Sequence, residues 1–151
     1  MVTVRLATEA DIPRILELYR ELAITTSQAE QEYKPTPDSF RQVFADIAAY
    51  PGHELVVAEE DGEVIGTLVL LIVPNLSHDA LPWALVENMV VDRQHRRRGM
   101  GKLLMDYAVT HARDAGCYKI TLSSNKKRPG AHRFYRSAGF EPSAHGFRRY
   151  F

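Results

Sequence analysis

The spacing of apolar side chains predicts a strand followed by a helix at the start of the chain. Val2–Ala7 alternates apolar and polar positions, as a strand with one buried face does. Thr8 and Asp11 have the spacing of a helix cap, and apolar residues then recur at helical spacing as far as Ala23. Residues 24–35 show no period and predict a loop.

The middle of the chain predicts a second helix and then three strands. Thr36-Pro37 resembles a helix cap followed by proline at the first helical position, and Pro51-Gly52 ends this helix after Ala49. Asp61-Gly62 is a strong hairpin signal. The three strands predicted around and after this turn are Glu54–Glu59, Val64–Val73 and Trp83–Val91.

The last third of the chain predicts two further helices and at least two strands. A helix over Gly101–Ala115 ends at Gly116, where a C-terminal glycine belongs. The elements expected after it are a strand at Tyr118–Ser123, a short helix at Ala131–Ala138, and one or two final strands around Phe140 and Phe147–Phe151.

The element order is therefore β-α-α-β-β-β-α-β-α-β. A strand–helix–strand unit lies within a mostly antiparallel run, which predicts an α/β fold with one mixed sheet and helices on both faces. We find no linker and expect a single domain over residues 1–151.

Composition and charge narrow the class of protein. The chain has 151 residues, of which 45% are hydrophobic and 25% charged, as is usual for a globular domain. Acidic and basic residues balance at 19 each, which argues against a dedicated nucleic-acid-binding protein. The stretch from Arg93 to Lys102 nevertheless holds five Arg or Lys residues and no acid, so a local anion site is compatible with the sequence.

Neither a disulfide framework nor a metal site is expected. The chain has one cysteine, Cys117, and its six histidines show no metal-ligand spacing. The N-terminus lacks the apolar run of a signal peptide, and the longest apolar stretch, Thr67–Pro74, is too short to span a bilayer. We therefore expect a cytoplasmic protein that has no membrane partner.

The segment from Val90 to Leu104 carries the most specific signal. A strand ends there, a basic turn with two glycines follows, and a helix begins. The first amide groups of a helix have no internal partner and carry the positive end of its dipole, so such a turn binds phosphates. Neither a Walker loop nor a dinucleotide fingerprint fits, because Leu103 and Leu104 occupy positions that those motifs require to be Ser or Thr and Gly.

The pattern that does fit is R-x-x-G-x-G, from Arg96 to Gly101. Together with the downstream segment Ala131–Phe140, in which Phe-Tyr on a short helix is followed by Gly-Phe, it resembles the GNAT superfamily of N-acetyltransferases. The order of strands and helices matches as well, so the resemblance covers nearly the whole chain. It implies an enzyme that transfers acetyl from acetyl-CoA to a primary amine, of a small molecule or of a protein, by direct attack in a ternary complex.

The resemblance also implies where acetyl-CoA binds. The cofactor would lie between the splayed strands Trp83–Val91 and Tyr118–Ser123. Backbone groups of one strand would hold the pantetheine arm, and amides of the basic turn would hold the pyrophosphate. The family often has an Asn close to the last helix, but Asn125 is separated from Ala131 by a basic insert, which could instead meet the 3′-phosphate or an acidic substrate. The implied cofactor-binding residues are Met89, Val90, Val91, Arg96, Arg97, Arg98, Gly99, Met100, Gly101, Lys102, Asn125 and Tyr135.

Two residues are candidates for catalysis. Tyr135 matches the family tyrosine that reaches the thioester sulfur, where a phenol could protonate the leaving thiolate; alternatively it only packs and contacts the cofactor. Glu87 is the one acid in an apolar strand, and its expected burial would raise its pKa and suit a general base. Its alternatives are a structural carboxylate and a ligand for the substrate ammonium.

The acceptor is not fixed by the sequence. By resemblance, residues 24–35 and 75–83 would contact it, with Glu30, Glu32, Tyr33 and Trp83 as candidate contacts. The segments Glu87–Val91 and Cys117–Leu122 look similar to glucosamine-6-phosphate N-acetyltransferases. The segments Phe134–Phe140 and Phe147–Phe151 look closer to general bacterial small-molecule or protein acetyltransferases, and family analogy does not determine substrate. Two alternatives are a non-catalytic acyl-CoA sensor and a nucleic-acid patch, and a homodimer formed through the C-terminal strands is expected by resemblance.

Overall fold

The computed structural model describes residues 1–22 and 27–151. Its centre is a five-stranded sheet with the order β1-β2-β3-β4-β5. Neighbouring strands are antiparallel except for β4 and β5, which are parallel. The predicted mixed, mostly antiparallel sheet is therefore confirmed. The strands are β1 (Val2–Leu6), β2 (His53–Glu60), β3 (Glu63–Val73), β4 (Trp83–Val91) and β5 (Lys119–Leu122).

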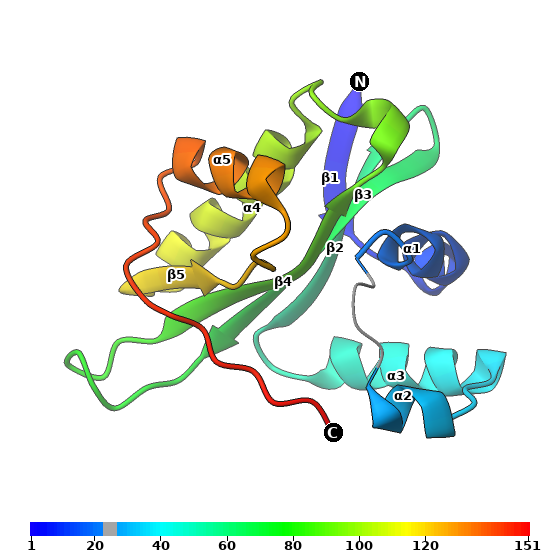
Figure 1. Cartoon of the computed structure of the whole chain (residues 1–151), viewed down its shortest axis with the longest axis horizontal. Coiled ribbons are helices and arrows are strands. Elements are labelled where there is room, and N and C mark those ends of the chain that lie inside the picture. The colour runs from blue at the N-terminus through cyan, green and yellow to red at the C-terminus, as the bar shows by residue number, and fades with distance from the viewer. Residues whose placement is uncertain (23–26) are drawn as a thin grey trace.

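Helices cover both faces of this sheet, as predicted. Figure 1 shows α4 and α5 on one side of the strands and α1, α2 and α3 on the other. None of the helices in the described residues is long and apolar enough to cross a membrane. The helices are η1 (Glu9–Asp11), α1 (Ile12–Tyr19), α2 (Gln28–Glu32), α3 (Pro37–Ala49), η2 (Arg93–His95), α4 (Met100–Asp114) and α5 (Pro129–Ser137).

Each face of the sheet has its own hydrophobic core. The larger core packs α4 against the strands, with Leu104 and Ala108 fully buried on Ile65 and Leu68 of β3. On the opposite face, Ile15 and Leu18 of α1 form a smaller core with neighbouring strand residues. Alternating strand residues thus face opposite cores, which explains why β3 is an almost continuous apolar run.

The turns and caps form where local side-chain chemistry predicts them. Asp61 and Gly62 both adopt positive φ, +51° and +81°, as the tight turn between β2 and β3 requires. Thr36 caps α3 by accepting a hydrogen bond from the Ser39 amide at 3.2 Å. Gly116 follows α4 with φ of +82°, as the sequence predicts for a helix that ends in glycine.

Two local predictions are wrong, and one lies partly outside the described residues. A short helix, α2, forms within the segment expected to be a loop, capped by Ser27. Residues 138–151 form no strand among the residues described, although Phe140 and Phe147–Phe151 predicted one or two. Aromatic spacing favours a strand, but a strand also needs a neighbour to pair with. Of the first predicted helix, Ala23 lies outside the described residues.

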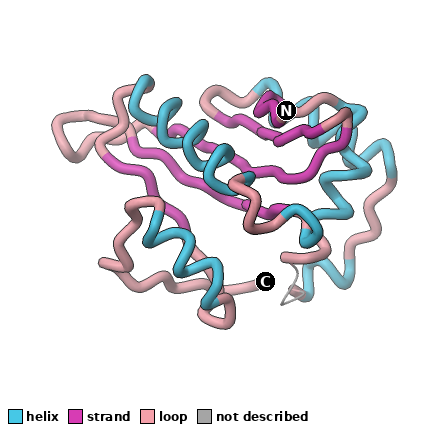
Figure 2. Tube along the Cα trace, turned by 90° about the horizontal axis from the view of Figure 1, so that it is seen from above, coloured by secondary structure: helices cyan, strands magenta, loops and turns pink. Residues whose placement is uncertain are grey.

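The C-terminal segment instead crosses the molecule toward α2. Its end lies near the α2 region in both views (Figures 1 and 2). The amide of Ala29 donates a hydrogen bond to the carbonyl of Phe151 at 3.0 Å, which ties the two segments together. We call residues 141–151 the C-terminal tail.

Candidate active site

The parallel strands β4 and β5 pair over a short stretch and then separate. Residues 83–86 of β4 pair with residues 119–122 of β5, and β4 then continues alone to Val91 on this side. Within the described chain, the β5-facing edge of residues 87–91 has no strand partner. Backbone groups on such an edge can pair with an extended ligand.

A bulge in β4 lies just beyond this fork. Thr67 of β3 pairs with Val90, whereas Val69 pairs with Glu87, so two residues of β4 stand against one of β3. One of the two, Asn88, has φ of +51°, in the left-handed region that non-glycine residues seldom adopt. The bulge therefore turns the side chains of residues 87–89 relative to a regular strand.

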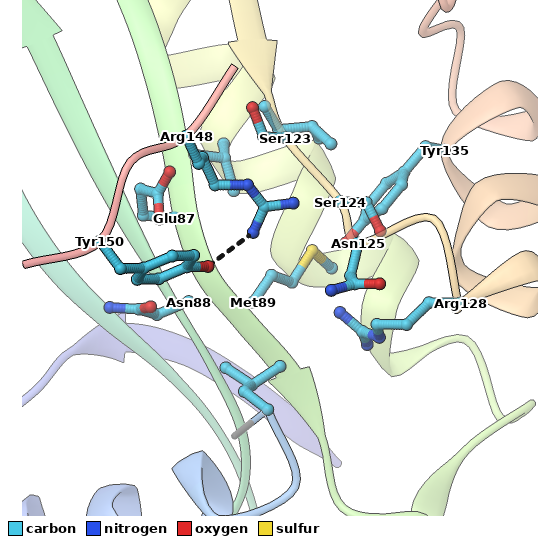
Figure 3. A pocket seen from close by; sticks show the side chains of 13 residues that line it. Glu87, Asn88, Met89, Ser123, Ser124, Asn125, Arg128, Tyr135, Arg148 and Tyr150 are labelled. Atoms are coloured by element: carbon cyan, nitrogen blue, oxygen red, sulfur yellow. Dashed lines mark hydrogen bonds between the residues drawn. The ribbon is translucent and has the colours of Figure 1, made fainter. Parts of the chain in front are cut away.

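A cavity of about 170 Å³ occupies the fork (Figure 3). It joins segments that are far apart in the sequence: the turn after α1, β4, the loop after β5, α5 and the C-terminal tail. The residues that line it are Leu22, Val86, Glu87, Asn88, Met89, Leu122, Ser123, Ser124, Asn125, Arg128, Tyr135, Arg148 and Tyr150.

Tyr135 reaches this cavity from α5. Its ring packs edge-on against Phe134 and Phe140, with ring centroids 5.5 Å and 6.3 Å away. Burial raises the pKa of the Tyr135 phenol, and the positive charge of Arg128 partly opposes this rise in pKa. The phenol is thus held protonated at neutral pH, as a proton donor must be.

Glu87 also lines the cavity, but the expectation that it is buried is wrong. Its side chain is exposed, as is that of the neighbouring Asn88. The apolar residues around Glu87 in the sequence predicted a buried position, whereas the bulge places it at the open side of the fork. Burial therefore gives no support to Glu87 as a base, whereas its position in the cavity does.

The loop after β5 contributes polar groups. The Asn125 side-chain oxygen accepts a hydrogen bond from the Lys127 amide at 2.9 Å, and its carbonyl lies 2.8 Å from His132 Nε2. These contacts fix the loop at the start of α5. The hydroxyl of Ser124 is buried and has no hydrogen-bond partner among the described residues. A buried hydroxyl without a partner is costly, so a ligand that bonds to it would be stabilising.

The basic turn leads into α4 with its first amides exposed. Gly99 is the N-cap and has φ of +83°, and Arg97 before it has φ of +62°. A Cβ placed on Gly99 would meet no atom within 4 Å, so the space above this glycine is open. The amides of the first helical turn have no partner within this 15-residue helix, a geometry that can bind an anion.

Most side chains of this turn are engaged with the protein. Arg96 donates to the Val91 carbonyl at 3.0 Å and pairs with Glu21 at 2.8 Å. Arg98 pairs with Glu60 at 3.3 Å, and Lys102 with Asp106 at 2.7 Å. An anion at this turn would therefore meet chiefly backbone amides, and Arg96 holds the turn against Glu21 in the segment after α1.

Comparison with known proteins decides the family. The model of the Acetyltransferase (GNAT) family matches residues 15–140. The chain belongs to the GNAT family. The segments Arg96–Gly101 and Ala131–Phe140 both lie within the matched residues, and the family resemblance drawn from them is confirmed.

Relatives of this GNAT chain are N-acetyltransferases. Aminoalkylphosphonate N-acetyltransferase of Salmonella typhimurium is 32% identical over 140 residues, covering 92% of this chain and 84% of that enzyme. Glucosamine 6-phosphate N-acetyltransferase 1 of Oryza sativa subsp. japonica is 32% identical over 108 residues, covering 70% of this chain and 64% of that enzyme. A solved structure of an Agrobacterium tumefaciens strain C58 protein has a TM-score of 0.86 at 37% identity, covering 97% of this chain and 98% of that one.

This GNAT protein is an acetyl-CoA-dependent N-acetyltransferase, as predicted, and its acceptor is an amine. The sensor without catalytic activity is not favoured by these relatives. The roles of the individual site residues stay predictions. The structure brings Tyr135, Glu87, Met89 and Asn125 to one cavity, while residues 96–102 form the turn at the start of α4.

The expected acceptor contacts do not line the cavity. Among the described residues, the cavity lining includes none of the four candidate contacts Glu30, Glu32, Tyr33 and Trp83. Residues 24–26 of the expected loop lie outside the described chain. Arg148 and Tyr150 of the C-terminal tail line it instead. Sequence reasoning missed both, and the only signal was the run of basic and aromatic residues from Phe147 to Phe151.

Proposed function

We propose that this enzyme acetylates a small primary amine bound in the cavity at the fork of β4 and β5. The observation that carries this proposal is that the two candidate catalytic side chains, Tyr135 and Glu87, line the same cavity from different elements. The two named relatives, whose names specify glucosamine 6-phosphate and aminoalkylphosphonates, support a small molecule over a protein amino group.

The residues present fit acetyl-CoA, which supplies an activated acetyl thioester when bound. The unpaired edge of β4 suits the amide-containing pantetheine arm, with Met89 and Val90 as its partners. The Val91 carbonyl already accepts a hydrogen bond from Arg96, so one of its two lone pairs remains for a ligand. The amides of Arg97 to Lys102 would hold the pyrophosphate, and Asn125 would close the side of the cleft next to α5.

Tyr135 acts as the general acid in this proposal. Because burial raises its pKa above the usual value of 10.0, the hydroxyl is protonated at neutral pH. A thiolate whose thiol has a pKa of about 8.5 is a weaker base than this phenolate, so the proton passes to the sulfur only in a positioned, desolvated contact as the carbon–sulfur bond breaks. The rings of Phe134 and Phe140 hold Tyr135 in place. The positive charge of Arg128 stabilises the phenolate that remains after transfer.

Glu87 takes up the proton of the amine, through a water molecule. Its exposed carboxylate suits this relay, because a solvated acid exchanges its proton quickly with bulk water and needs no buried pathway. The same carboxylate attracts the ammonium form of the acceptor before deprotonation. The attack on the acetyl carbon is direct, without an acyl-enzyme, so the half-exposed Cys117 has no part in it.

The test measures free thiol released from acetyl-CoA with a panel of small primary amines and with a peptide that has a free N-terminus. We expect turnover with small amines and not with the peptide. Glu87→Gln should lower kcat about 10–100-fold, and the loss should shrink as the pH rises and the free amine becomes more abundant. Glu141→Gln, a change of an exposed tail acid outside the cavity, is the matched control. Equal rates for Glu87→Gln and Glu141→Gln would remove Glu87 from the mechanism.

The proposal also includes assembly and location. We propose a cytoplasmic enzyme that forms a homodimer and takes neither nucleic acid nor membrane as a partner, which the balanced charge of the chain supports. Phe147 and Phe151 of the tail are 93% and 79% exposed, and a second copy of the chain would cover such side chains. Light scattering after size exclusion tests the dimer: a mass of about twice 17.1 kDa is expected.

A further inference from the structure

Two guanidinium groups in the cavity have no acidic partner within the described chain. Arg128 and Arg148 both line it, and no carboxylate of the described residues lies within 4.0 Å of either one. Elsewhere in the fold, arginines next to the sheet are paired, as Arg5 is with Asp11 and Glu59 and Arg14 is with Asp92. The described part of the protein therefore leaves the positive charge of the cavity without a neutralising contact.

The two arginines come from different elements. Arg128 is the residue before α5, whereas Arg148 comes from the C-terminal tail. Figure 3 shows the Arg148 guanidinium extending into the cavity, where it donates to the Tyr150 hydroxyl at 3.2 Å. The hydrogen bond between the Phe151 carbonyl and the Ala29 amide anchors the end of the tail, so Arg148 is held over the fork.

Neutral groups of the same cavity complete the set of donors. The buried Ser124 hydroxyl has no partner among the described residues, and the Tyr150 hydroxyl still has a proton to donate after accepting from Arg148. The Glu87 carboxylate makes no ion pair with Arg148 in the described structure, although both line the cavity. In the residues described, one cavity thus presents a carboxylate and two guanidinium groups to a ligand.

We propose that Arg148 and Arg128 form a subsite for a tetrahedral oxyanion on the acceptor, so that the substrate is a small amine carrying a phosphate or phosphonate group. The inference rests on the proposed function and names its substrate class. Two guanidinium groups match a dianion better than a singly charged carboxylate, and guanidinium–phosphate hydrogen bonds are about twice as strong as neutral ones. Glu87 then faces the ammonium end of the same molecule.

The C-terminal tail is the specificity element in this arrangement. It supplies Arg148 and Tyr150 directly to the acceptor, and within the described residues it forms no strand that would fix these side chains in a sheet. Changes in the tail should therefore alter acceptor choice without altering acetyl-CoA binding.

The experiment compares kcat/KM for amines of matched length: 2-aminoethylphosphonate, 2-aminoethyl phosphate, β-alanine and ethanolamine. We expect kcat/KM for the phosphonate and the phosphate to exceed that for ethanolamine by about 100-fold or more, because ethanolamine has no anionic group and loses both charge-assisted contacts. The value for β-alanine should lie between that for ethanolamine and those for the two dianions. In Arg148→Gln this preference should fall by about tenfold, and in Arg128→Gln by a similar factor. Arg149→Gln, a neighbour in the same exposed tail that lies outside the cavity, is the matched control and should keep the wild-type preference.

Two further measurements distinguish an oxyanion subsite for the acceptor from a phosphate contact that serves the cofactor. Calorimetry with ethylphosphonate, which lacks the amine, measures binding to the CoA-saturated protein; binding that Arg148→Gln abolishes supports the subsite even if no amine is acetylated. If Arg128→Gln instead weakens CoA and leaves acceptor preference unchanged, Arg128 serves the cofactor and its place in the subsite is refuted.

The failure of the subsite and the failure of the proposed function give different results. Equal kcat/KM for ethanolamine and 2-aminoethylphosphonate, without ethylphosphonate binding, overturns the inference while leaving acetylation of small amines intact. Failure of every amine together with normal acetyl-CoA binding would count against the proposed function.

Discussion

Arg96 lies against Glu21, with 2.8 Å between its Nη2 and Glu21 Oε2. Its Nε donates to the Val91 carbonyl at 3.0 Å, so the guanidinium joins the end of β4 to the turn after α1. The first residue of the R-x-x-G-x-G pattern is therefore a positioning residue for the loop in this structure. The adjacent Leu22 lines the cavity, so the same turn contacts both the basic turn before α4 and the cavity at the fork.

The contact between Glu21 and Arg96 predicts how cofactor affinity responds to substitution. Arg96→Gln and Glu21→Gln should each weaken CoA about 3–10-fold, because the loop amides lose their fixed position. The loss should be the same for CoA and for 3′-dephospho-CoA, measured by calorimetry. Arg41→Gln, which removes a surface arginine that pairs with Asp38 and Glu9, is the control for the general effect of losing an ion pair. A loss confined to CoA would show that Arg96 binds the 3′-phosphate directly.

Tyr135→Phe tests proton donation to the sulfur. Removing the hydroxyl should lower kcat by about 100-fold while the Kd of acetyl-CoA changes little, because the ring and its packing remain. Because the pKa of Tyr135 lies above 10.0, wild-type kcat should show no loss from ionisation of this residue below about pH 10. Tyr107→Phe is the matched control, since burial also raises the pKa of Tyr107 but its hydroxyl faces Glu54, away from the cavity. Equal kcat for the two variants would contradict the assignment.

Asp11 gives a prediction for the pH dependence of stability. The hydrogen bond from Arg5 lowers the pKa of Asp11 below 3.8, and bonds from Thr8 act in the same direction. As pH falls below about 4, the unfolded chain binds this proton before the folded one, so the free energy of unfolding decreases on acidification and is fully regained above that pH. Asp11→Asn should cost about 1–3 kcal/mol at pH 7 and less at pH 3.

Urea denaturation at pH 7 and pH 3 measures this difference. Asp46→Asn provides the comparison, because Asp46 is an exposed helix residue bonded only to the Gln42 side chain at 3.1 Å among the described residues. If Asp11→Asn lowers the free energy of unfolding by the same amount at both pH values, the ion pair between Asp11 and Arg5 does not cause the pH dependence of stability.

The sequence predicted elements whose causes are local. The Asp61-Gly62 turn, the Thr36 cap and the glycine after α4 depend on a few adjacent residues, and each formed as expected. The basic turn into α4 also formed where the sequence predicted it, because glycine spacing and the start of a helix both depend on consecutive residues. Phosphate binding by this turn stays a prediction.

Features that depend on distant partners were not predictable. The aromatic spacing of Phe147–Phe151 favoured a strand, but the tail has no strand to pair with in the described structure. The exposure of Glu87 follows from a bulge whose register is set jointly by β3 and β4. Arg148 reaches the cavity because the tail crosses toward α2, a path that no local pattern encodes.

The position of the cofactor can be tested by calorimetric titration of acetyl-CoA into wild type and two glycine variants. Gly99→Ala and Gly62→Ala both place a Cβ at similar φ, +83° and +81°, and in both a Cβ meets no atom within 4 Å, so their backbone strain is comparable. Gly62 lies in the remote β2–β3 turn, whereas Gly99 caps α4 in the proposed pyrophosphate site. We expect wild type and Gly62→Ala to bind equally, and Gly99→Ala to bind about tenfold or more weakly. Equal affinity in all three proteins would place the cofactor away from this loop and contradict the proposed site.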